Sequence, residues 1–160
     1  MKDDTIGVLG ARLLFPHNST QGNRPAGKIQ HLGLAMDVRG NVTHPLIGWS
    51  AENPKTKISR EVFAVTGALF TTRSKLFHTV RGFDPIYGLG YYEDVSYCLN
   101  IRQLGFRIYM DANIGGIHYT NGTSEKNSNA FGGQINQNAM TFRAKWANSG
   151  LLGFDSWSYG

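Results

Sequence analysis

The sequence predicts a single α/β domain, in which a mixed β-sheet with a β-hairpin is flanked by helices. A chain of 160 residues, of which 41% are hydrophobic, is long enough for one compact domain and short for two. Its apolar segments alternate between strand-like runs and helix-like patterns, as in α/β folds. Its 20 glycines exceed the usual share of about 7% and indicate many loops between short elements. We therefore expect one domain over residues 1–160, with a core at about 6–146 and a tail at 147–160.

Strands dominate the prediction for the first half of the chain. Residues 6–15 (IGVLGARLLF) form an apolar run whose length suits a buried strand. Residues 28–47 are typical of a β-hairpin around a turn at 39–41 (RGN). Residues 62–72 (VFAVTGALFTT) are β-branched, aromatic or apolar at nearly every position, which predicts the central strand. Polar loops are expected between these elements, at 16–27 and 50–59.

Helices dominate the prediction for the second half. Ser74 is suited to cap a short helix that ends near Val80. Residues 93–104 place apolar side chains on one stripe and are followed by Gly105 at the expected C-cap, so this segment is the clearest helix. The remaining expected segments are short strands at 106–111 and 114–119 split by a turn, a mobile loop rich in glycine, serine and asparagine at 121–133, and a final helix at 134–146.

The composition excludes several classes of protein. Cys98 is the only cysteine, which excludes an intramolecular disulfide and a multi-cysteine zinc site. No run of about 18 apolar residues predicts a membrane span, and the opening residues MKDDTIGVLG lack the layout of a signal peptide. These features predict a cytoplasmic protein.

The net charge of +5 favours anionic partners such as nucleotides or phosphates. The basic residues occur singly along the chain and form no block of like charges, which argues against nucleic acid as a partner. A basic RNA-binding domain nevertheless stays open as an alternative. Such a domain would bind RNA with a steep dependence on salt concentration.

Two adjacent carboxylates, Glu93 and Asp94, stand at the expected start of the 93–104 helix. A carboxylate at this place can cap the free backbone N–H groups of the first turn. Alternatively, one carboxylate caps while its neighbour faces a cleft as a general base. The preceding segment GLGYY has glycines that can serve as hinges, and Tyr91 and Tyr92 as flat surfaces, in a loop that closes over a sugar or a base.

His118 lies near the end of the last expected strand, with glycines before and after it. It is either a surface or packing residue, or a metal ligand or phosphate contact that the glycines make accessible. Among the other histidines, His31 and His44 are the strongest candidates for a function because both fall in the predicted hairpin.

Thr66, Gly67 and Ala68 form a step of small residues within the predicted central strand. A glycine weakens a strand unless a packing neighbour or a ligand needs a close approach. The residues alone favour neither explanation.

Taken in order, these segments resemble the C-terminal half of a family 2 glycosyltransferase with the GT-A fold. The resemblance runs from about residue 6 to Trp146 and rests on seven motifs in the family's order and spacing. The motifs are Ile6-Gly-Val-Leu-Gly-Ala-Arg-Leu-Leu, Ile29-Gln-His-Leu-Gly, Arg60-Glu-Val-Phe-Ala-Val-Thr-Gly-Ala, Gly82-Phe-Asp, Glu93-Asp-Val-x-x-Cys-Leu, Gly105-Phe-Arg-Ile and His118.

The resemblance implies an enzyme that transfers or hydrolyses a sugar from a nucleotide-sugar donor, such as a UDP-sugar, with inversion and with a glycan or another hydroxyl compound as acceptor. In that family the acidic pair supplies the catalytic base, which here matches Asp94, while Glu93 would orient the acceptor or support the base. The small-residue segment at 66–68 would line the donor site. His118 would help to bind Mn²⁺ or Mg²⁺ on the donor diphosphate, and these metals suit oxygen ligands plus one imidazole.

The chain departs from the family pattern in two respects. The nucleotide-binding half with the D-x-D metal motif is missing, although Asp3-Asp4-Thr5 resembles the end of that motif, and Ser96 stands where aspartate is common. The resemblance therefore implies a truncated or miniature glycosyltransferase domain, whose donor site a homo-oligomer or a partner chain would complete. The alternative is a non-catalytic carbohydrate-binding or assembly module, which would bind glycans through tyrosines and tryptophans without metal or nucleotide.

Overall fold

A mixed β-sheet and three α-helices share one hydrophobic core in the computed structural model, which describes residues 2–17, 25–37, 39–88, 90–119 and 128–152. This is the mixed α/β architecture that the sequence predicts. The elements in chain order are β1 (Ile6–Leu14), β2 (Ile29–His31), β3 (Ala35–Met36), β4 (Val42–Thr43), the 3-10 helix η1 (Pro54–Lys57), β5 (Arg60–Glu61), β6 (Phe70–Thr72), α1 (Ser74–Thr79), the 3-10 helix η2 (Pro85–Tyr87), α2 (Glu93–Gln103), β7 (Arg107–Ile117) and α3 (Ser128–Trp146).

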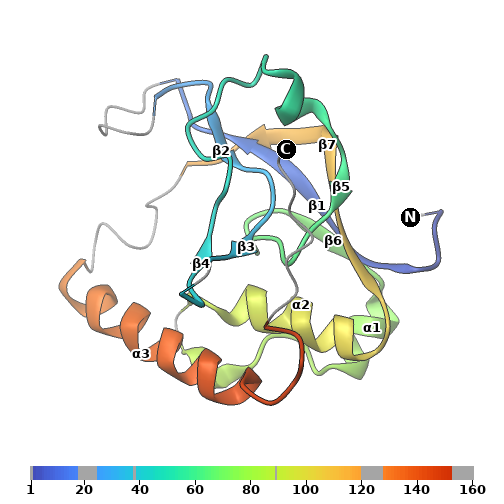
Figure 1. Cartoon of the computed structure of the whole chain (residues 1–160), viewed down its shortest axis with the longest axis vertical. Coiled ribbons are helices and arrows are strands. Elements are labelled where there is room, and N and C mark those ends of the chain that lie inside the picture. The colour runs from blue at the N-terminus through green and yellow to red at the C-terminus, as the bar shows by residue number, and fades with distance from the viewer. Residues whose placement is uncertain (1, 18–24, 38, 89, 120–127, 153–160) are drawn as a thin grey trace.

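Strand β1 is the centre of the main sheet (Figure 1). It runs parallel to β7 on one side, and on the other side it pairs antiparallel with β6 near its start and with β2 at its end. Strand β5 pairs antiparallel with β7. Val8 and Leu13 of β1 are almost completely buried, so the prediction of a buried strand at 6–15 is confirmed.

The predicted central strand at 62–72 is wrong, since only its last residues, in β6, form a strand. Residues 62–65 are completely buried, but their backbone groups find partners outside a strand ladder. The N–H of Leu34 donates to the carbonyl of Ala64 at 2.8 Å, and the Arg102 guanidinium donates to two carbonyls of the segment. Because the backbone is satisfied in this way, the segment can be as apolar as a central strand without being one.

The predicted hairpin at 28–47 is present in a smaller form. Strand β2 joins the main sheet, and only β3 and β4 pair with each other, as a separate two-stranded sheet. Asp37 stabilises the turn between them, because its carboxylate accepts the N–H groups of Arg39 and Asn41, both at 2.8 Å. The turn at 39–41 is therefore confirmed.

Helices α1 and α2 confirm the predictions for their segments, with one correction. Helix α2 covers nearly all of 93–104 and is followed by Gly105 at a φ of +86°. Ser74 is the first helical residue of α1 rather than its cap. The N-cap position belongs to Arg73, whose side chain makes no capping hydrogen bond.

Helix α3 ends at Trp146 as predicted but begins at Ser128, six residues before the predicted start. The backbone at 128–133 is therefore helical, where the sequence predicted a mobile loop. The other predicted loop and tail segments fall partly outside the described residues, at 18–24, 120–127 and 153–160.

The two short strands predicted at 106–111 and 114–119 are one strand, β7. The expected turn between them is a shift in register, because the pairing jumps from Asp111 to Gly115 between two successive residues of β1. The residues between these two positions have no partner on β1, which is how a parallel pair accommodates extra residues in one strand.

Gly115→Ala is expected to destabilise the fold by about 1–3 kcal/mol, as over-packing does. A Cβ atom at this position would lie 2.3 Å from the carbonyl oxygen of Arg12, a backbone atom that cannot rotate away. Gly116→Ala is the matched control, since a Cβ there meets no atom of the described residues within 4 Å. Urea denaturation compares the two variants, and equal midpoints would contradict the register of β1 and β7.

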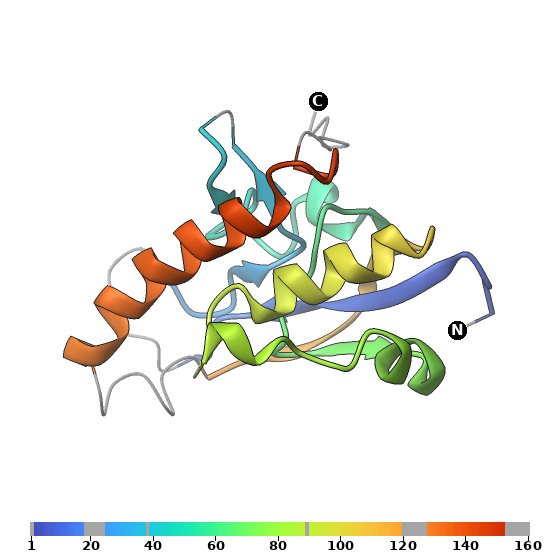
Figure 2. The ribbon, with the colours of Figure 1, turned by 90° about the horizontal axis from the view of Figure 1, so that it is seen from below.

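Helix α2 lies against β1 and β7, and α3 lies beside α2 (Figure 2). The indole Nε1 of Trp146 in α3 donates to the Ser96 Oγ of α2 at 3.2 Å, and both residues are almost completely buried. Ser96 therefore joins the two helices.

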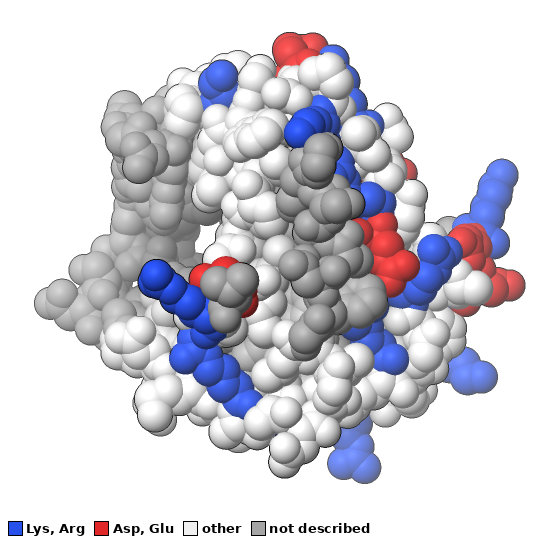
Figure 3. All heavy atoms as spheres, viewed as in Figure 1, with Lys and Arg blue, Asp and Glu red and all other residues white. Residues whose placement is uncertain are grey.

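Charged side chains are spread over the face shown in Figure 3, with Lys and Arg among Asp and Glu. Several charged side chains of the described residues are paired, as in the Lys57–Glu52 and Lys145–Asp84 salt bridges, whose N···O distances are 2.7 and 2.8 Å. Among the described residues, no helix has both the length and the apolar character needed to cross a membrane.

Candidate functional site

Asp94 lies in the first turn of α2, where Glu93 is the first helical residue. The backbone before the helix is unusual, because Gly90, Tyr91 and Tyr92 have positive φ angles of 139°, 68° and 75°. Residues other than glycine rarely adopt this conformation, and such strained positions concentrate at functional sites. The sharp entry to α2 sets the direction in which both carboxylates leave the backbone.

Asp94 joins α2 to the small-residue segment at 66–68. Its Oδ2 accepts the N–H of Gly67 and its Oδ1 accepts the N–H of Val95, both at 2.8 Å. The acidic pair and the small-residue segment, which the sequence assigned to one site, are therefore in direct contact.

The surroundings of Gly67 leave room for a small side chain. A Cβ atom added there would meet Asp94 Cβ at 3.4 Å and Phe83 Cζ at 4.0 Å, which are ordinary contact distances. Gly67 and Ala68 are both exposed. Packing against the described residues does not require the glycine, and its exposed backbone can be approached from solvent.

Both carboxyl groups of the acidic pair have raised pKa values. Burial raises the pKa of Asp94 above its ordinary value of 3.8, although the hydrogen bonds from Gly67, Val95 and Thr66 favour the charged form. Burial also raises the pKa of Glu93, and the Asp94 charge adds to this effect. Within the described part of the chain, no donor reaches the buried Oε2 of Glu93. A carboxylate with a raised pKa accepts a proton more readily, which suits a general base.

Asn138 of α3 fixes the loop that precedes the acidic pair. Its side-chain amide donates to the carbonyls of Tyr87, Gly90 and Tyr91 at 2.8, 2.8 and 3.0 Å. Asn138 is 1% exposed, so these bonds are shielded from water. The sequence predicted hinges in this loop, whereas the structure shows it anchored to α3 at three carbonyls.

The two tyrosines of this loop have different environments. Tyr91 is 40% exposed. Tyr92 packs against Phe142 of α3, with ring centroids 5.1 Å apart, and burial raises the pKa of its hydroxyl. Of the two, Tyr91 is therefore the one that can present a flat surface to a ligand.

His118 follows β7 and is held by Gln30 of β2. The Nε2 of Gln30 donates to the carbonyl of His118 at 3.0 Å, which leaves Gln30 Oε1 to face His118 Nδ1 at 2.7 Å. An amide oxygen only accepts, so the imidazole proton is on Nδ1 and Nε2 of the neutral ring keeps a lone pair. Metal-binding histidines have this arrangement, in which one ring nitrogen donates to an oxygen and the other binds the metal.

His31, at the end of β2, is buried and contacts three segments of the chain. Its Nδ1 lies 3.2 Å from the Nδ1 of His44, and its Nε2 accepts the N–H groups of Gly33 and Thr66, each at 3.3 Å. Burial lowers the pKa of both imidazoles, and the charges of His44 and His118 lower the pKa of His31 further. His31 therefore links the neighbourhood of His118 to the segment that contacts Asp94.

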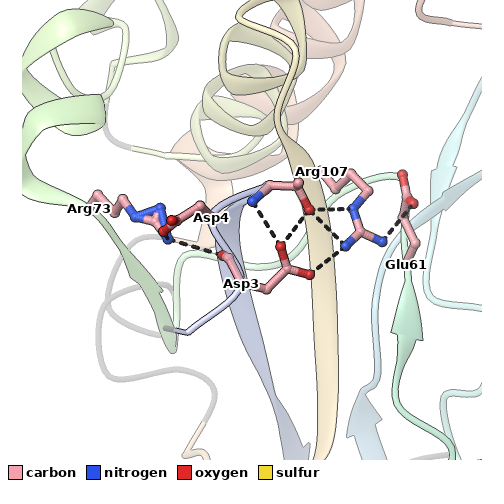
Figure 4. Close-up of polar contacts among 6 residues, drawn as sticks. Asp3, Asp4, Glu61, Arg73 and Arg107 are labelled. Atoms are coloured by element: carbon pink, nitrogen blue, oxygen red, sulfur yellow. Dashed lines mark hydrogen bonds and ion pairs between the residues drawn. The ribbon is translucent and has the colours of Figure 1, made fainter.

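The acidic residues Asp3 and Asp4 do not join this site. Asp3 forms an ion pair with Arg107 at 2.7 Å and Asp4 forms one with Arg73 at 3.0 Å, as Figure 4 shows. Arg107 follows the end of α2, whereas Asp94 lies in its first turn, and a helix of 11 residues is about 16 Å long. Their resemblance to the end of a D-x-D motif is therefore a likeness of sequence alone, and the structure uses them as ion-pair partners at the other end of α2.

Comparison with known proteins finds similarity to much longer chains. Over 121 residues the chain is 28% identical to the O-antigen biosynthesis protein RfbC of Myxococcus xanthus. The aligned region covers 71% of this chain and 8% of that protein. Over 105 residues the chain is 25% identical to the uncharacterized protein y4gI of Sinorhizobium fredii. This aligned region covers 63% of this chain and 11% of that protein. No family model and no solved structure matches. The chain thus spans about a tenth of the length of these relatives, one of which is named for O-antigen biosynthesis.

Proposed function

We propose that the chain is a family 2 glycosyltransferase domain of the GT-A type, which moves a sugar from a nucleotide-sugar donor to a hydroxyl group. The observation that carries this proposal is the 2.8 Å hydrogen bond between Gly67 and Asp94, because it joins the segments that the family's motifs assign to the donor site and to the base. The similarity to an O-antigen biosynthesis protein supports a sugar-related function. The mixed α/β fold is compatible with the GT-A type.

Asp94 is the catalytic base in this proposal. The acceptor hydroxyl attacks the anomeric carbon of the donor sugar and gives its proton to the Asp94 carboxylate, while the bond from that carbon to the nucleoside diphosphate breaks, with inversion. Burial of Asp94 supports this role, because it raises the pKa of the carboxyl. Glu93, whose buried Oε2 has no donor among the described residues, orients the acceptor or supports the base.

The surface beside Asp94 is suited to a sugar nucleotide. The exposed Gly67 and Ala68 allow a ligand to approach the backbone closely. The Thr66 hydroxyl favours the charged form of Asp94, and the exposed ring of Tyr91 offers a flat surface to a sugar or a base.

His118 is the residue through which the chain would bind Mn²⁺ or Mg²⁺. Its Nδ1 is tied to Gln30, which leaves Nε2 for a metal and fits a donor set of one imidazole plus diphosphate oxygens. A bound ion would neutralise the charge that develops on the departing nucleoside diphosphate. Among the described residues, no three His, Cys, Asp or Glu side chains gather as a metal site. The further ligands of the ion would therefore come from the diphosphate and from a second copy of the chain or a partner chain.

A mixture of Mn²⁺ and UDP is expected to raise the melting temperature of the chain by about 5–10 °C when UDP is present at about 100 times its dissociation constant. The reason is that a ligand bound only by the folded state stabilises that state. His118→Ala should abolish the increase, whereas His78→Ala, a change at an exposed histidine of α1, should leave it intact. Thermal melting with UDP alone, Mn²⁺ alone and both together measures the effect.

Two results would contradict this expectation in different ways. No increase with any nucleotide, with or without metal, would rule out a donor site in this chain. Stabilisation by glycans that needs neither metal nor nucleotide would favour the non-catalytic carbohydrate-binding module instead.

A further inference from the structure

We infer that His31 is a positioning residue that holds the 66–68 segment in place, so that the Gly67 N–H meets the Asp94 carboxylate. Its catalytic meaning rests on the proposed role of Asp94 as the base. The hydrogen-bond geometry itself does not depend on that role and can be tested without a donor or an acceptor.

The two hydrogen bonds at His31 Nε2 fix the proton of the ring. The N–H groups of Gly33 and Thr66 both point to this nitrogen, at 3.3 Å, and two donors need a nitrogen that carries no proton. The proton of the neutral ring is therefore on Nδ1, which faces the Nδ1 of His44 at 3.2 Å. His44 must accept it, so the proton of His44 is on Nε2. The rings meet edge-on, at an interplanar angle of 78°, which this hydrogen bond allows.

The contacts of His31 continue to Asp94 in two steps. His31 Nε2 accepts the N–H of Thr66, and the next N–H along the chain, that of Gly67, donates to Asp94 Oδ2 at 2.8 Å. Thr66 lies between these two bonds, so the imidazole and the carboxylate hold successive peptide groups. A second link, from the Leu34 N–H to the Ala64 carbonyl at 2.8 Å, ties the same two stretches of chain together.

No strand ladder could replace His31 in this role. Residues 65–69 belong to no strand or helix, and Gly67 and Ala68 are exposed to water. The position of the Gly67 N–H therefore depends on the side chains that bind its neighbours. A carboxylate loses stabilisation of its charged form when such an N–H moves away, so the effect of His31 should be measurable at Asp94.

The first experiment determines the proton positions in the wild-type chain by nitrogen NMR at neutral pH. We expect His31 to carry its proton on Nδ1 and His44 on Nε2, with a coupling through the hydrogen bond between the Thr66 amide nitrogen and His31 Nε2. A proton on His31 Nε2 would overturn the inference. This measurement needs no variant, so it tests the proton position even if a substitution at His31 prevents folding.

The second experiment measures the pKa of Asp94 in two variants by NMR of its carboxyl carbon. His31→Leu removes the acceptor and is expected to raise this pKa by about one pH unit, with faster hydrogen exchange at Gly67. His31→Gln can present an oxygen to the same two N–H groups and should restore both values. His78→Gln, at an exposed histidine, is the control and should change neither.

A purely structural role gives a different result. In that case His31→Leu and His31→Gln would lower the melting temperature while the pKa of Asp94 and the exchange at Gly67 stayed at their wild-type values, and the inference would be wrong. Failure of the sugar-transfer proposal would leave these measurements unchanged, so the two proposals can be rejected separately.

Discussion

Asp94→Asn is expected to reduce sugar transfer or donor hydrolysis by about 10²–10⁴-fold, the usual contribution of a general base. The amide has the size of the carboxylate and keeps one oxygen to accept the Gly67 N–H, at the cost of the bond from the Val95 N–H to the second carboxylate oxygen. It cannot take up the acceptor's proton. The melting temperature should fall by less than about 4 °C, which corresponds to about 1 kcal/mol in a domain of this size. Release of nucleoside diphosphate from UDP-sugars and thermal melting measure the two effects.

Glu93→Gln is the matched control for this substitution, because it makes the same chemical change at the adjacent carboxylate. We expect a smaller loss of activity than with Asp94→Asn, and activity that still rises with pH as Asp94 ionises. A different pattern would identify Asp94 as a structural tether: a large fall in melting temperature on Asp94→Asn, with activity recovered at lower temperature.

Arg102→Met is expected to lower the free energy of unfolding by about 2–4 kcal/mol, because two buried backbone carbonyls lose their donor. The Arg102 side chain is only 7% exposed and lies 3.3 Å from Glu61. It also donates to the carbonyls of Val62 and Phe63, two completely buried residues that belong to no strand. Methionine fills similar space but leaves these acceptors without their donor. Equilibrium unfolding in urea measures the loss.

Lys57→Met is the control for the loss of a charge. Lys57 lies closer to its partner Glu52, at 2.7 Å, but these side chains are 51% and 85% exposed. Exposed pairs contribute about 0–1 kcal/mol, so this variant should unfold nearly like the wild type. Similar losses for Lys57→Met and Arg102→Met would show that burial does not set the strength of the Arg102 contacts.

Local sequence patterns correctly predicted the elements whose residues are buried in one regular way from end to end. The apolar run of β1 and the stripe of α2 each show such a pattern, and both elements were predicted nearly to their ends. Residues 62–72 show why a local sequence pattern can predict the wrong element. Complete burial is typical of a central strand, but here the carbonyls and N–H groups bond to side chains that lie far away in the sequence, such as Arg102 and His31. No local pattern contains those partners.

The candidate site was predicted from the order of motifs rather than from geometry. That order placed Asp94 near Gly67 and included Gln30 without a role, but it did not include Asn138, although both of these residues hold neighbouring groups. For Asn138 a sign was present, because it stands four residues before Phe142 and eight before Trp146, on the buried side of α3. A polar residue on such a stripe needs hydrogen-bond partners inside the protein. For Gln30, by contrast, only the pairing of distant segments reveals the contact with His118.

The anchoring of the loop by Asn138 also sets an order of events during synthesis of the protein. Asn138 is 51 residues later in the chain than Tyr87, the first carbonyl that it binds. At about 5–20 residues per second, a ribosome makes the loop about 3–10 s before it makes the anchor. During that interval the three carbonyls of the loop lack the Asn138 amide as a donor, and the loop that precedes the acidic pair is not yet anchored. The proposed site can therefore be completed only after α3 has been made.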